Sequence, residues 1–218
     1  MSGPRVLHED ARLLAVDKPP GQTVIPGRGE APGASLIEGL RAGGGNFLVV
    51  HRIDRETSGV VLFAKDARSH RELCALFEGR SVEKEYRALA RGRPPREGLV
   101  ELPLREFGSG RTAPHPAGKP CATRFEVLEE LSGACLLRVR PLTGRRHQIR
   151  AHLCAIGHPI LGDPLYGPRR EETDPARTML HAAALRFALP GEAPLEISAP
   201  LPGDFEACLR RLRRSNEL

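Results

Sequence analysis

The sequence reads His51-Arg52-Ile53-Asp54-Arg55-Glu56-Thr57-Ser58-Gly59 at the point that most constrains its fold and its chemistry. Apolar runs flank this stretch at 47–50 and 60–64. Runs of that length, bounded by polar residues, are typical of buried strands, so we expect a loop joining two core strands. Asp54 would lie on that loop, beside cations that keep it ionised and on a scaffold rigid enough to aim it. A carboxylate held in this way suits a nucleophile or a general base.

The composition favours a polyanionic partner. The chain has 218 residues, 33 lysines and arginines, most of them arginine, and a formal net charge of +6 at pH 7. The planar fork of arginine suits phosphate recognition, although charge alone leaves nucleic-acid binding an even question. The chain has no tryptophan and only 4% aromatic residues, which disfavours a surface that stacks many single-stranded bases.

Cysteine and histidine spacings predict neither disulfides nor a metal site. The five cysteines form no CxxC pair, and their number is odd. His147 and His152 are five residues apart, whereas two ligands on one helical face need a spacing of three or four. The first ten residues are polar and no apolar run approaches the length needed to cross a membrane. We therefore expect a cytoplasmic protein with free thiols and no metal.

Predicted strands and helices interleave without a strict βαβ rhythm, so the expected class is α+β or mixed α/β. A long stretch between them, 105–120, is rich in Gly, Pro and Arg and predicts a surface loop, either functional or merely tolerated. We expect strands at 6–16 (as a hairpin), 82–90, 121–128, 135–139, 182–189 and 195–198, and helices at 34–40, 66–77, between Gly144 and Gly157, and at the basic C-terminus.

A second cationic cluster packs five arginines and two histidines into residues 138–152, across a predicted strand-to-helix turn. A helix N-terminus presents free N–H groups and a positive dipole end, so this turn would attract anions. Arg145 and Arg146 are expected in the first helical turn, where the dipole disfavours cations and function would override stability. The alternative is that these arginines pair with the chain's own acids. Arg150 is expected to point partly inward, so it needs a carboxylate, for which Asp54 is a candidate.

Five motifs together resemble the RluA-type family of RNA pseudouridine synthases. The stretch 51–59 is similar to the family's catalytic motif, and together the five cover about residues 5–200 in the family's order and spacing. Any one short match would be weak, whereas five in order are specific. The other four are Asp17-Lys18-Pro19-Pro20-Gly21, Lys84-Glu85-Tyr86, Gly118-Lys119-Pro120-Cys121-Ala122-Thr123, and 142–150 followed by 158–163.

The resemblance implies a large, mainly antiparallel, bent central sheet flanked by helices, with the active site in a cleft across the sheet. It also implies that a uridine within RNA is detached at N1 and rejoined to its ribose through C5, without metal or cofactor. Asp54 would be the catalytic aspartate, Tyr86 would lie against the uracil, and Arg150 would pair with Asp54. Arg52 would enter the space left by the flipped base. The candidate RNA contacts are Lys18, Arg52, Arg55, Lys84, Arg145, Arg146 and His147.

The chemistry suits these residue types. Breaking a nucleoside C–N bond builds positive charge on the sugar, which an ionised Asp54 can stabilise or trap at C1′. Alternatively, Asp54 can remove the 2′ proton and give a glycal, and the residues do not decide between the routes. A base within folded RNA must first be flipped out, at a cost of a few kcal/mol. Tyr86 can equally be a half-buried strand residue, Lys18 an exposed turn lysine and His147 a scaffold residue.

Two other functions fit parts of the pattern. One is a protein of this fold that binds RNA without modifying it. The other is a nucleoside or glycoside hydrolase, for which Glu56 is the only nearby general acid. We expect residues 1–218 to form a single catalytic domain without a separate RNA-binding domain, because the motif pattern begins within the first ten residues. Such a monomer would bind structured tRNA or ribosomal RNA through its own basic surface.

Overall fold

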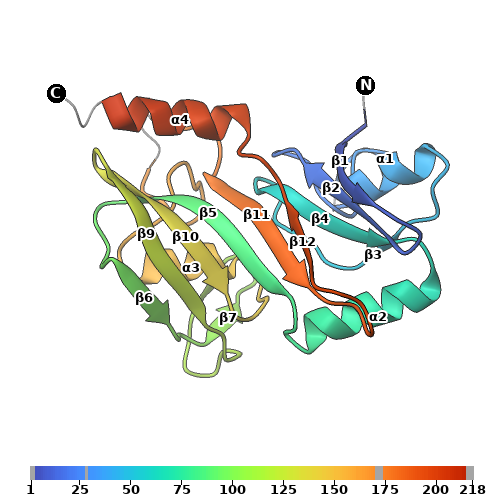
Figure 1. The fold of residues 1–218 in the computed structure, drawn as a ribbon. Coiled ribbons are helices and arrows are strands. Elements are labelled where there is room, and N and C mark those ends of the chain that lie inside the picture. The colour runs from blue at the N-terminus through green and yellow to red at the C-terminus, as the bar shows by residue number, and fades with distance from the viewer. Residues whose placement is uncertain (1–2, 28, 170–173, 215–218) are drawn as a thin grey trace. The chain divides into compact units, whose positions relative to one another are not determined.

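The computed structural model describes residues 3–27, 29–169 and 174–214. The chain divides into two compact units, one formed by residues 1–84 with 182–200 and the other by 85–181 with 201–218 (Figure 1). Both units combine antiparallel strands with helices, which confirms the α+β class. The chain passes from one unit to the other within strand β5, within strand β11 and after Pro200.

The first unit is organised around β4, whose seven residues are all buried. The predicted hairpin is confirmed, because β1 and β2 pair in antiparallel fashion, and β2 then runs along β4. The strand order continues from β4 to β11. The strands of this unit are β1 (Arg5–Glu9), β2 (Leu13–Lys18), β3 (Leu48–Val49), β4 (Ser58–Ala64), β11 (Leu180–Phe187, from residue 182 on) and β12 (Leu195–Ser198).

Both predicted helices of the first unit are confirmed, with ends shifted by one or two residues. In α1 (Leu36–Ala42) a capping box joins Ser35 and Glu38. In α2 (Ala67–Glu78) the Asp66 carboxylate accepts two N–H groups of the first turn, at 2.8 and 2.9 Å. The helix α2 packs on β4 and β3, and its buried Leu73 joins the core formed by alternate residues of β2 and β4.

The second unit contains the strands β5, β10, β9 and β6 in that order. The predicted strands at 82–90, 121–128 and 135–139 are confirmed with shifted ends, whereas β6 was not predicted. The strands are β5 (Glu83–Arg91, from residue 85 on), β6 (Glu97–Val100), β9 (Thr123–Leu131) and β10 (Ala134–Pro141), with a separate hairpin of β7 (Leu104–Glu106) and β8 (Thr112–Pro114).

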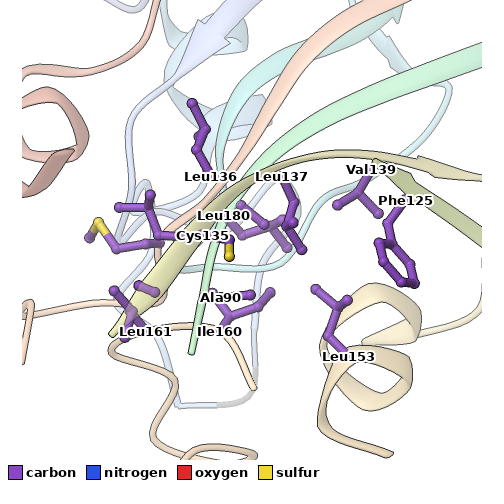
Figure 2. Packing of buried hydrophobic residues seen from close by; sticks show 14 of the residues in the cluster. Ala90, Phe125, Cys135, Leu136, Leu137, Val139, Leu153, Ile160, Leu161 and Leu180 are labelled. Carbon is purple, nitrogen blue, oxygen red and sulfur yellow. The ribbon is translucent and has the colours of Figure 1, made fainter. Parts of the chain in front are cut away.

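Two helices, α3 (Gln148–Ala155) and α4 (Gly203–Arg214), complete the second unit. Figure 2 shows Leu153 pointing from α3 toward Phe125 and Ile160, with Leu137 and Val139 of β10 above them. The predicted C-terminal helix is confirmed as α4, and its Phe205, Cys208 and Leu209 belong to the same core. Arg177, which lies just before β11, donates two charge-assisted hydrogen bonds to Asp204, at 2.6 and 2.9 Å. These bonds connect the start of α4 to the segment that precedes β11.

Two expectations about this unit are wrong in detail. The stretch 105–120 is not an irregular loop, since its first half forms the β7–β8 hairpin. Strands of three residues leave too little periodicity to be recognised, and backbone pairing carries them. The helix α3 begins at Gln148, so Arg145 and Arg146 lie in the turn before it rather than in its first turn. The predicted conflict with the helix dipole therefore does not arise at these two residues.

Candidate active site

Asp54 lies on the loop between β3 and β4, as predicted. The loop closes in a turn in which the Thr57 N–H donates to the Asp54 carbonyl at 3.1 Å. The neighbouring side chains alternate in burial, because Ile53 and Thr57 are buried whereas Arg52 and Arg55 are exposed. The buried side chains anchor the loop to the unit and the arginines remain accessible, so the loop presents a partly exposed carboxylate with cations beside it.

Lys18 anchors this loop through buried hydrogen bonds. The side chain is fully buried, and its Nζ donates to the carbonyls of Pro19, Gln22 and Arg55 at 2.8, 2.8 and 3.0 Å. Arg55 also exchanges two hydrogen bonds of 2.9 Å with the backbone of Gly21. An ammonium has three protons, and three carbonyls occupy them. Lys18 is therefore not the exposed turn lysine considered from the sequence, and its contacts fit a residue that fixes the Asp54 loop to the 18–22 turn.

His51 fixes the start of the same loop. Its Nε2 accepts the Leu62 N–H of β4 at 3.0 Å, and its ring stacks on Phe77 of α2 with 4.6 Å between centroids. Burial, with the nearby charge of Lys84 as a second cause, lowers the pKa of His51 to about 3. A neutral ring is also what accepting an N–H at Nε2 requires. His51 is thus a scaffold residue that fixes the start of the Asp54 loop.

Gly59 closes the motif because β11 lies against it. Its φ is +112°, and a Cβ at this position would lie 2.1 Å from the Ala182 carbonyl oxygen. Only glycine combines that conformation with so close an approach of another backbone. The Thr-Ser-Gly ending of the motif therefore sets the distance between β4 and β11, directly after the Asp54 loop.

Tyr86 and Arg150 both belong to the second unit and lie on the same side of its strands. Tyr86 pairs with Val139 in the β5–β10 register, and Val139 pairs with Phe125 in the β10–β9 register. Cross-strand partners share a face, and this is the face against which α3, the helix that carries Arg150, packs. Asp54 belongs to the first unit, so its pairing with Arg150 stays a prediction.

Arg150 has a carboxylate partner within its own unit. Its Nε and Nη2 donate to Asp163 Oδ2 and Oδ1 at 2.7 and 2.9 Å, and its side chain is 8% exposed while that of Asp163 is fully buried. An inward Arg150 was predicted, and it is confirmed. The role of Asp163 was missed, because nothing in the sequence pairs two residues thirteen positions apart across the end of a helix.

The turn before α3 is braced by a buried network that sequence reasoning also missed. The Gln148 amide oxygen accepts the Thr143 hydroxyl at 2.6 Å and the Arg145 N–H at 3.0 Å. Its nitrogen donates to Ala122 O and Thr123 Oγ1 at 2.9 and 3.0 Å. Thr123 then meets His152 Nδ1 at 2.9 Å, and burial lowers the pKa of this histidine. Every polar atom of the Gln148 side chain has partners, which makes the turn rigid.

The five arginines of the second cluster go to different places. Arg138 and Arg140 lie on the face opposite Tyr86, where both contact Glu85, at 3.4 and 2.8 Å. Arg145 and Arg146 are exposed, and Arg146 forms a 3.5 Å ion pair with Glu106. His147 takes a left-handed conformation with φ +53° and lies 3.1 Å from the Tyr166 hydroxyl. Pairing with the chain's own acids therefore accounts for Arg138 and Arg140, whereas Arg145 and Arg146 are exposed in the turn.

Lys84, the remaining candidate, is half-buried, and burial lowers its pKa. Among the described residues, no group of three or more His, Cys, Asp or Glu side chains is arranged to hold a metal ion. None of the helices in the described ranges combines the length and apolarity needed to cross a bilayer.

Comparison with known proteins agrees with the geometry. A family model of RNA pseudouridylate synthase matches residues 12–155. Ribosomal large subunit pseudouridine synthase C of Vibrio vulnificus is 42% identical over 221 residues, covering 96% of this chain and 70% of the relative. Ribosomal large subunit pseudouridine synthase D of Pasteurella multocida is 36% identical over 239 residues, covering 98% and 72%.

The fold leads to the same group of proteins. The solved structure of human RNA pseudouridylate synthase domain containing 4 superposes with a TM-score of 0.77 and 27% identity, covering 96% of this chain and 93% of that one. The matched region includes the Asp54 loop, Tyr86 and Arg150, all of which lie within residues 12–155. The chain belongs to the RluA-type family of RNA pseudouridine synthases and is an isomerase that converts uridine in RNA to pseudouridine.

Proposed function

We propose that this synthase acts on structured RNA through Asp54, and that ribosomal RNA is the first substrate to test. In this proposal Asp54 is the catalytic carboxylate, Tyr86 lies against the uracil and Arg150 pairs with Asp54. Arg52 fills the space left by the flipped base. The names of the relatives, which specify the large ribosomal subunit, support ribosomal RNA ahead of tRNA.

The observation that carries this proposal is how the Asp54 loop is held. Lys18 fixes the loop through Arg55 O, and His51 fixes its start through Leu62 N–H. A loop restrained at both ends holds a carboxylate in a constant orientation, which positioning catalysis requires. Yet Arg52 and Arg55 are exposed on the same loop, where RNA can reach them.

The remaining contacts follow from exposure and charge. Arg145 and Arg146 are exposed on a rigid turn, and we propose that they bind phosphates, with His147 and the half-buried Lys84 as further contacts. Lys18 is reassigned from phosphate contact to loop positioning, since three carbonyls use its three protons. We further propose a cytoplasmic monomer.

The reaction needs one carboxylate and no net change in composition. The N1–C1′ bond breaks with its electron pair going to the base, and the ionised Asp54 stabilises or traps the positive charge left on the sugar. The base then turns so that C5 bonds to C1′. The proton on C5 is lost and N1 gains one, so the product is an isomer of the substrate.

Replacing Asp54 tests the proposal. Asp54→Asn keeps the shape of the side chain and removes its charge, so we expect turnover to fall by a factor on the order of 10³ or more, while RNA binding and folding are retained. Release of tritium from RNA labelled at uridine C5 measures the reaction, because C5 loses its proton only when the new bond forms. Glu56→Gln is the matched control, a neutralised carboxylate on the same loop, and should remain active.

Two results would contradict this assignment. Full activity of Asp54→Asn would exclude Asp54 as the catalytic group, and release of free uracil by the native protein would indicate hydrolysis instead. The substrate is identified separately, by mapping pseudouridines in total RNA from cells with and without this gene. A missing pseudouridine in tRNA but not in ribosomal RNA would reject the proposed substrate and leave the role of Asp54 intact.

A further inference from the structure

Two contacts restrain the guanidinium group of Arg150, one along its edge and one on its face. The edge formed by Nε and Nη2 donates two hydrogen bonds to Asp163, at 2.7 and 2.9 Å. One face of the guanidinium lies over the ring of Tyr166, with 5.0 Å from its carbon to the ring centroid. A bidentate pair fixes the plane of a guanidinium and a ring contact fixes its tilt, so the group cannot rotate in place.

Asp163 is itself fixed by the turn that it begins. Its Oδ1 accepts the N–H groups of Leu165 and Tyr166, at 3.0 and 3.1 Å, in addition to the arginine. Gly162, the preceding residue, has a φ of +71°, and a Cβ there would lie 2.1 Å from the Arg177 carbonyl oxygen. Four donors and a tightly packed backbone therefore hold one carboxylate in one orientation.

Tyr166 completes the arrangement. It is 4% exposed, and its hydroxyl accepts the Thr112 N–H of β8 at 2.8 Å while lying 3.1 Å from His147 Nδ1. The Tyr166 ring that contacts Arg150 is therefore anchored to the β7–β8 hairpin and to the turn before α3. Neither Asp163 nor Tyr166 has a role in the mechanism described above.

We propose that Asp163 is a positioning residue for the synthase reaction, which acts by fixing the orientation of Arg150. The inference rests on the proposed role of Arg150 at the catalytic site. Asp163 accepts hydrogen bonds from Nε and Nη2 of Arg150, so it sets the direction of the rest of the guanidinium, including Nη1. Loss of the carboxylate would leave Arg150 in place but free to turn.

Asp163→Asn tests the inference, because the amide has nearly the same shape but opposes one of the two arginine donors with its own NH₂ group. We expect kcat to fall on the order of 10²-fold, with the KM for RNA changing by less than about threefold. Asp204→Asn is the matched control, because Asp204 forms another two-bond pair in this unit, with the buried Arg177. It should lower stability and leave kcat unchanged below its unfolding temperature.

A double-mutant cycle separates positioning from a general loss of structure. If Asp163 acts through Arg150, Asp163→Asn combined with Arg150→Lys should be no slower, within about threefold, than Arg150→Lys alone. Losses in kcat that multiply would overturn the inference, as would a native kcat in Asp163→Asn. If Asp163→Asn does not fold, Asp163→Glu replaces it, since it keeps the charge and moves the carboxylate by about 1.5 Å. A native kcat in that variant would also overturn the inference.

The activity of Asp54→Asn distinguishes the two failures. An active Asp54→Asn enzyme would reject the proposed function, whatever Asp163→Asn does. An inactive Asp54→Asn enzyme beside a fully active Asp163→Asn enzyme would reject only the positioning role.

Discussion

Replacing Gly59 by alanine should separate two strands of the first unit. A Cβ at Gly59 would lie 2.1, 2.8 and 2.9 Å from the O, C and N atoms of Ala182. These are backbone atoms, so no side-chain rotation relieves the overlap and β4 or β11 must move. A side chain at the positive φ of +112° costs about 1–2 kcal/mol, and overpacking of this kind about 1–3 kcal/mol more. We expect Gly59→Ala to lower the free energy of unfolding by about 2–5 kcal/mol.

Gly44→Ala isolates the contribution of the collision. Gly44 lies in the same unit with a φ of +93°, but nothing lies within 4 Å of its would-be Cβ. This variant should therefore cost only the conformational part, about 1–2 kcal/mol. Urea unfolding is followed by far-UV circular dichroism, because the chain has no tryptophan to report on folding by fluorescence. Equal destabilisation by the two substitutions would refute the argument that β11 requires a glycine at this position.

Three further predictions concern charged groups. Arg150→Ala leaves the Asp163 carboxylate buried and unpaired, so we expect a loss of about 3–5 kcal/mol in urea unfolding together with lost turnover; native stability would contradict the importance of this pair. Lys18→Met removes a donor from three carbonyls and should lower both stability and kcat, whereas unchanged stability with weaker RNA binding would restore the phosphate contact. Because the pKa of His51 is about 3 in the folded protein, below its unfolded value of about 6.5, its contribution to stability is complete above pH 6.5 and decreases as the pH falls toward 3. Between pH 7.5 and pH 5.0, the unfolding free energy should therefore change more for the native protein than for His51→Gln. The additional change should be less than about 1.4 kcal/mol per pH unit, because His51 retains some exposure.

Local patterns predicted the elements of both units well, for a physical reason. A helix cap such as Asp66, a terminating Gly79 and the alternation in β9 are properties of short segments, so they can be read without knowing the rest of the chain. The β7–β8 hairpin could not be predicted in this way. Its strands have three residues each, and part of what stabilises β8 is the Thr112 hydrogen bond to Tyr166, 54 residues away.

The candidate site was predicted only in part, because only some of its contacts are local in the sequence. The motif around Asp54 is continuous in sequence, so its loop and its flanking strands could be inferred from 47–64 alone. The supports of that loop could not, because the Lys18 bond to Arg55 spans 37 positions and the Asp163 bonds to Arg150 span 13. A sequence motif shows which residues are grouped together, but it does not distinguish a side chain that contacts substrate from one that holds its neighbour.

The positions of the arginines in the 138–152 cluster show why the number of basic residues overestimates the extent of a binding surface. The cluster at 138–152 contains five arginines, but Arg138 and Arg140 pair with acids on the face opposite Tyr86, and Arg150 is buried against Asp163. Strand periodicity forces this division, because alternate residues of β10 face opposite sides. The turn before α3 leaves Arg145 and Arg146 exposed, on a backbone that Gln148 makes rigid. A net charge of +6 therefore indicates a polyanionic partner, but the region that meets RNA is set by which arginines lack a buried or cross-strand acid within reach.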